Sequence, residues 1–127
     1  MKTMMRIAAG ALAAATVMSP AVALADAPYA QAAALVRPDG SRGPSKNVLR
    51  TFRTSTGNYC VVLSDGVNLD GPVAIQATLA GHYPFPRTLS VEVGTQQCEH
   101  DHFQTIAVHS QNAVGEPRDV AFYLTVS

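Results

Sequence analysis

The sequence predicts an all-β fold, an antiparallel β-sandwich or flattened barrel of about seven strands with one disulfide. Three observations lead to this expectation. Short stretches alternate apolar and polar residues with a period of two, as strands with one buried face do. Turn residues separate these stretches at intervals of roughly 10 to 15 residues. No stretch has the 3.6-residue period of an amphipathic helix, and the chain is poor in Leu, Glu and Lys.

Residues 1–25 have the features of a signal peptide. Lys2 and Arg6 precede an apolar run over 7–18, and Ala23-Leu24-Ala25 supplies the small residues that a signal peptidase needs. A retained anchor is the alternative, but the run is shorter than the roughly 20 residues that span a bilayer. We therefore expect cleavage after Ala25, which leaves one secreted domain of about 100 residues.

The first strands are separated by strong turn signals. After a flexible Ala-rich segment over 26–33, the β domain is expected to occupy 34–127. Its first strand, 34–37, ends at the turn Pro38-Asp39-Gly40, and Gly43-Pro44 predicts a loop over 41–46. The next strand, 47–53, has Arg50 between two apolar residues, which favours an edge position.

The later strands have clearer faces. In 58–64, Tyr59, Val61 and Leu63 share one face and Cys60 and Val62 the other, so both faces are expected to be buried. Alternation continues through the remaining four predicted strands, which are separated by Gly- and Pro-containing loops: 73–79, 89–93, 103–109 and 120–126.

The two cysteines, Cys60 and Cys98, predict a disulfide. An isolated pair in an exported chain is most simply oxidised, and no Cys-x-x-Cys is present. Closing a loop of this length stabilises a domain by roughly 3 to 4 kcal/mol.

Charge excludes several partners. Two of the nine basic residues lie in the leader, which leaves seven basic against nine acidic side chains. Such a surface lacks the positive field that nucleic acids or anionic membranes require. We expect a monomer without a cofactor whose partner is a protein or a cell-surface ligand.

The segment 81–87, Gly-His-Tyr-Pro-Phe-Pro-Arg, is the first candidate site. Two prolines restrict a loop that carries Tyr83 and Phe85, with Arg87 beside them, and a restricted loop loses little entropy on binding. The alternative is that one aromatic ring folds back and caps the end of the sandwich.

A second candidate is the segment 99–102, Glu-His-Asp-His. His100 and His102 would project from the same side of an extended chain, and Asp101, His82 or His109 could add a third ligand for zinc or copper. The alternative is a solvated loop beside the disulfide.

A small hydrolase is the third possibility. Glu92, Arg87 and His82 are residue types that could serve acid–base chemistry, but no hydrolase motif accompanies them. We expect the protein not to be an enzyme.

Two stretches resemble a family of small exported actinobacterial proteins without an assigned function, some of whose domains are similar to phage tail-fibre or adhesin-type β modules. They are 34–63, ALVRPDGS…SKNVLRTFRTSTGNYCVVL, and 108–126, VHSQNAVGEPRDVAFYLTV. The resemblance implies secretion and a β fold, and it transfers no catalytic residue. The sequence therefore predicts an exported, non-enzymatic binding or surface-associated β domain.

Overall fold

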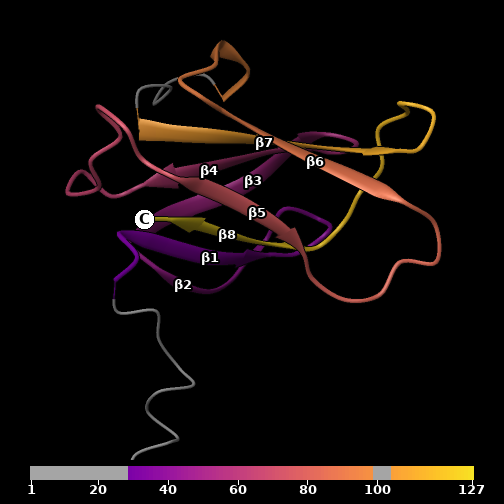
Figure 1. Ribbon diagram of the computed structural model, residues 1–127, viewed down its shortest axis with the longest axis horizontal. Coiled ribbons are helices and arrows are strands. Elements are labelled where there is room, and N and C mark those ends of the chain that lie inside the picture. The colour runs from indigo at the N-terminus through magenta and orange to yellow at the C-terminus, as the bar shows by residue number, and fades with distance from the viewer. Residues whose placement is uncertain (1–28, 99–103) are drawn as a thin grey trace, which may run out of the picture.

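The computed structural model describes residues 29–98 and 104–127. In this part of the chain eight strands form two four-stranded antiparallel sheets that pack as a sandwich (Figure 1). The strands are β1 (Ala32–Val36), β2 (Arg42–Lys46), β3 (Val48–Ser55), β4 (Asn58–Leu63), β5 (Ile75–Leu79), β6 (Arg87–Val93), β7 (Thr105–Asn112) and β8 (Phe122–Val126). One sheet has the order β2-β1-β8-β5 and the other β3-β4-β7-β6. The predicted all-β fold is confirmed as a sandwich.

Most strand boundaries differ from the sequence prediction by one to three residues, and two differences change the architecture. Residues 41–46, expected to be a loop, contain β2, which pairs with β1 at the edge of its sheet. Pro44 has no N–H to donate, and an edge strand is where a sheet tolerates that loss. The first strand also begins before residue 34, because β1 starts at Ala32, and the Gln31 N–H donates to the Val126 carbonyl at 2.7 Å.

The core lies between the sheets and is built from one face of each inner strand. Tyr59, Val61 and Leu63 of β4 are fully buried, as the alternation predicted. From the opposite sheet, Phe122 of β8 meets Tyr59 edge-on with ring centroids 5.3 Å apart. Both faces of β4 are buried, which confirms the prediction for this strand.

The other face of β4 carries the disulfide. Cys60 and Cys98 are bonded, with their Cα atoms 5.6 Å apart, and no free cysteine is found among the described residues. The bond packs with Ala107 and Phe52 in a small cluster on the outer face of the β3-β4-β7-β6 sheet. The predicted pairing is confirmed.

Four connections gather at one end of the sandwich, which we call the loop end. They are the β1–β2, β3–β4, β5–β6 and β7–β8 connections, at the right in Figure 1. The last described residue, Ser127, lies at the opposite end, where the Gln31 amide donates to its carbonyl at 2.8 Å.

One half of the loop end is tied together by Asp119 and Tyr59, and we call this the Tyr59 corner. Asp119 Oδ1 accepts from the Gly57 N–H at 2.8 Å, and its other oxygen pairs with the Arg53 guanidinium. The Tyr59 hydroxyl donates to the Pro38 carbonyl at 2.8 Å, lies 3.2 Å from Asp119 Oδ1 and accepts from the Val120 N–H. Burial raises the pKa of Tyr59 to about 12, and the nearby Asp119 carboxylate adds to the rise.

Candidate functional site

The other half of the loop end exposes apolar side chains. Phe85 of the β5–β6 loop is 69% exposed and Val114 of the β7–β8 turn is 78% exposed. With three neighbours they line a shallow hollow of about 220 Å³, and its full lining is Phe85, Pro86, Asn112, Ala113 and Val114. We call this the Phe85–Val114 patch. Exposed apolar side chains that line one hollow make this patch the candidate interaction surface.

The β5–β6 loop is held so that Phe85 points outward. The Tyr83 ring packs against the core, and its hydroxyl accepts the Ala121 N–H at 2.7 Å. Arg87 lies over the Tyr83 ring at 5.6 Å and donates to the Phe85 and Pro86 carbonyls at 3.2 and 3.1 Å. Contacts of Tyr83 with the core and hydrogen bonds from Arg87 to the loop carbonyls therefore fix the shape of the loop.

Asn112 organises the turn that presents Val114. Its side-chain oxygen accepts the N–H groups of Val114 and Glu116 at 3.0 and 2.9 Å, and its amide nitrogen donates to the Glu116 carboxylate. Gly115 takes a positive φ of 87°, which allows the chain to reverse there. Glu116 in turn pairs with Arg118 at 2.9 Å.

The three predicted binding residues therefore occupy different places. Tyr83 folds back onto the core, as the capping alternative describes, whereas Phe85 is exposed. Arg87 is engaged with its own loop. Sequence reasoning missed Val114, whose only local signal is a β-branched apolar residue between Ala113 and Gly115 in a turn.

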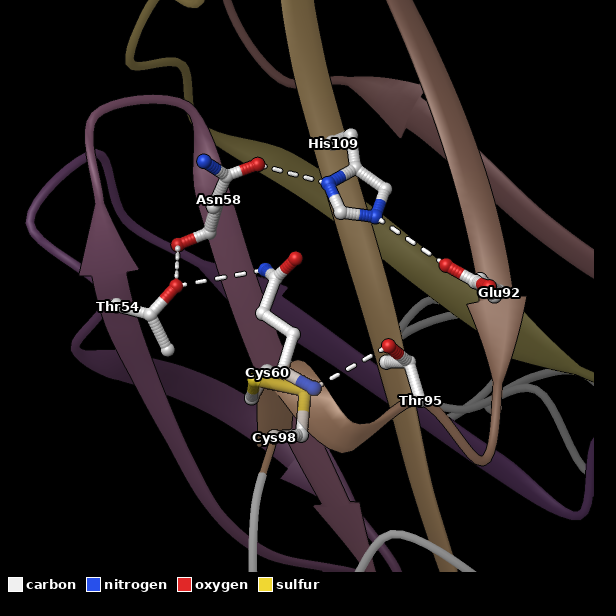
Figure 2. The surroundings of a disulfide bond; sticks show 8 residues. Thr54, Asn58, Cys60, Glu92, Thr95, Cys98 and His109 are labelled. Atoms are coloured by element: carbon white, nitrogen blue, oxygen red, sulfur yellow. Dashed lines mark hydrogen bonds and ion pairs between the residues drawn. A yellow bond between two sulfur atoms is a disulfide. The ribbon is translucent and has the colours of Figure 1, made fainter.

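A row of polar side chains crosses the outer face of the β3-β4-β7-β6 sheet, near the disulfide (Figure 2). His109 of β7 lies between Asn58 of β4, with Nδ1 and Oδ1 2.7 Å apart, and Glu92 of β6, with Nε2 and Oε1 3.7 Å apart. The Asn58 amide nitrogen is already donating to Ser55 and Thr56, so its oxygen faces the ring. His109 Nδ1 must then carry the proton, and Nε2 faces the Glu92 carboxylate.

The hydrolase set is not assembled on this face. Glu92 faces His109 rather than His82, its side chain is 61% exposed, and His82 lies in the exposed β5–β6 loop. Arg87 is engaged with the Phe85 and Pro86 carbonyls. Arg87 and Glu92 are also five residues apart on β6, so their side chains leave opposite faces of the strand.

The predicted metal segment lies outside the described residues, because His100, Asp101 and His102 fall within 99–103. Of the other proposed ligands, His82 is in the β5–β6 loop and His109 is on the outer face of β7. Within 29–98 and 104–127, no three His, Cys, Asp or Glu side chains are grouped closely enough to hold a metal ion.

Comparison with protein-family models, curated proteins and solved structures finds no match for this chain. Over the described ranges, no helix is long and apolar enough to cross a membrane. A disulfide is compatible with an oxidising, extracytoplasmic compartment. Fold and surface together define the class: an all-β, single-disulfide sandwich with an exposed apolar patch at its loop end.

Proposed function

We propose that the protein is an exported, non-enzymatic binding domain that docks a protein partner on the Phe85–Val114 patch. The observation that carries the proposal is the pairing of two largely exposed apolar side chains from connections far apart in sequence. The predicted leader, the disulfide and the predicted resemblance to exported adhesin-type β modules support an extracytoplasmic location.

The chemistry of the patch favours an apolar protein side chain as its occupant. Protein interfaces combine an apolar centre, in which aromatic residues are enriched, with a polar rim. Phe85 and Val114 form such a centre, and Asn112, which also lines the hollow, provides a polar edge. The bracing of both connections lowers the entropy cost of binding, because the loops are already ordered. A patch of this size fits a weak or transient contact.

Small probes test the proposal directly. N-acetyl-leucine amide and N-acetyl-phenylalanine amide represent apolar protein side chains, and N-acetylglucosamine represents a glycan. Titration of each into the isotope-labelled protein, followed by amide chemical shifts, should move the signals of residues 113–115 with the amino-acid amides.

Phe85→Ala should abolish these shifts, whereas Tyr123→Ala, which removes an exposed aromatic ring from β8, should leave them unchanged. If only N-acetylglucosamine moved these signals, the ligand of the patch would be a glycan and not a protein. If none of the three probes moved these signals, or if Phe85→Ala changed nothing, the patch would not be the binding site.

A further inference from the structure

The four edge strands differ in how well they are protected against pairing with another chain. Unprotected edges offer unpaired N–H and C=O groups, and proteins block them with proline, charge or irregular pairing. β2 carries Pro44 and two basic residues. β3 carries Arg50 and Arg53 and two register shifts, and β6 carries Arg87 and Glu92. β5, Ile-Gln-Ala-Thr-Leu, has no charge and no proline, and it pairs with β8 without a register shift.

The register identifies which β5 groups face outward. The Ser127 N–H donates to the Ala74 carbonyl, and the Ala80 N–H donates to the Ala121 carbonyl. Hydrogen-bonded residues alternate along an antiparallel pair, so Gln76 and Thr78 also bond to β8. The backbone N–H and C=O groups of the three other residues therefore point away from β8, towards the open edge of the sheet. These residues are Ile75, Ala77 and Leu79.

We propose that β5 pairs with β5 of a second copy of this chain, antiparallel about a twofold axis at Ala77. In this register the outward-facing residues of the two copies meet as Ile75 with Leu79, Ala77 with Ala77 and Leu79 with Ile75. Each such pair exchanges two backbone hydrogen bonds, about six in all. The result is one continuous sheet through both copies.

The side chains favour a second copy as the occupant because the strand is complementary to itself. On the exposed face, Gln76 of one copy lies opposite Thr78 of the other, an uncharged pair that can form a hydrogen bond. On the core side, Ile75 and Leu79 are only partly buried, and each would gain an apolar neighbour. No like charges meet anywhere along the five residues, and a twofold contact is the commonest way in which soluble chains associate.

This arrangement departs from the monomer that the sequence predicts, and it does not depend on the proposed binding function. Antiparallel β5 strands would direct the two loop ends in opposite directions. The Phe85–Val114 patches of the two copies would therefore both stay uncovered.

The pairing can be tested by sedimentation equilibrium over a range of protein concentrations. The sample is the oxidised protein that an exporting host secretes when it expresses the full sequence. The wild-type average mass should rise with concentration towards that of two chains. Ala77→Pro removes an outward-facing N–H and leaves the β5–β8 hydrogen bonds intact, so it should weaken association at least tenfold. Thr78→Lys should do the same, because the two introduced lysines would lie diagonally across the axis, about 7 to 8 Å apart.

Ser45→Lys is the matched control, since it adds the same charge to the exposed side of β2, the other edge of the same sheet, and should leave association unchanged. Thermal unfolding shows whether each variant is folded. Thr78→Lys provides the test if Ala77→Pro does not fold. An average mass equal to that of one chain at every concentration would overturn the proposal. So would a dimer that persisted in both β5 variants, or one that Ser45→Lys disrupted.

Discussion

The two halves of the loop end use their polar groups in opposite ways. In the Tyr59 corner, Asp119 and the Tyr59 hydroxyl join the β1–β2, β3–β4 and β7–β8 connections to one another. In the other half, one bond joins two connections, from the Ala121 N–H to the Tyr83 hydroxyl. The side chains of Asn112 and Arg87 bond within their own segments, and the exposed apolar side chains of the patch face solvent.

This difference separates stability from recognition. Bonds between connections hold the sandwich end closed, so their loss affects the whole domain. Bonds within a connection fix only its local shape, and the side chains that it presents can change without disturbing the core. We therefore expect substitutions in the Tyr59 corner to lower stability and substitutions in the patch to alter binding.

The largest difference is expected between two glycines with positive φ. A Cβ at Gly57, φ 74°, would lie 2.6 Å from the Ser110 carbonyl oxygen and 2.8 Å from the Arg118 nitrogen. At Gly115, φ 87°, a Cβ would meet nothing within 4 Å. Gly57→Ala should therefore cost about 3 kcal/mol of unfolding free energy, and Gly115→Ala about 1 kcal/mol from backbone strain alone. Urea unfolding measures both, and equal losses would contradict the comparison.

Removal of the Asp119 carboxylate should have the next largest effect. Asp119→Ala leaves the Gly57 N–H without its acceptor and Arg53 without its partner, so we expect a loss of about 2 kcal/mol. Glu116→Ala, in the patch half, removes an exposed carboxylate and should cost about 0.5 kcal/mol. Denaturant titration of the two variants gives the comparison, and a larger loss for Glu116→Ala would reverse it.

The Tyr59 corner should also produce an alkaline pH dependence. The pKa of Tyr59 is raised to about 12 in the folded protein, above the value of about 10 for an exposed tyrosine. Between these two pH values the folded state keeps a proton that the unfolded state has lost, so stability falls as the pH rises. Unfolding free energy measured from pH 9 to 12 should decline.

Tyr59→Phe should make that decline shallower. At neutral pH it should cost about 1 kcal/mol, because the Pro38 carbonyl and the Val120 N–H lose their partner. An unchanged pH profile in this variant would assign the alkaline decline to other groups.

The smallest effect on stability is expected in the patch itself. Phe85→Ser and Val114→Ser replace largely exposed side chains, so each should change the free energy of unfolding by less than about 0.5 kcal/mol. Thermal unfolding checks this expectation. A drop of several degrees would mean that the patch belongs to the core rather than to a binding surface.

The sequence predicted the inner strands well because their alternation records burial directly. β4 and β8 have apolar residues at every second position, and those residues fill the core together with Ile106 and Val108 of β7. β2 was missed because Gly43-Pro44 has the composition of a loop. Only the position of this segment at a sheet edge, a property of the whole topology, makes it a strand.

The candidate site was only partly predictable for the same reason. The prolines around Phe85 indicated a restricted aromatic loop, but its partner Val114 comes from another connection, and only the folding of the chain places the two together. The direction of Tyr83 depended on a hydrogen bond to the Ala121 N–H, which no local pattern records. The open β5 edge was equally invisible, since strand order determines which strands lie at an edge.

The bond between Gln31 and Ser127 has a practical consequence for engineering. It holds the beginning of the described domain beside its end, on the side of the sandwich away from the Phe85–Val114 patch. Because residues 31 and 127 lie together, a chain reconnected between them would need only a short linker, with new ends opened in an exposed connection. A fusion partner at residue 127 would likewise leave the loop end facing outward, so the domain is suited to use as a display scaffold in which exposed positions such as Phe85 and Val114 are varied.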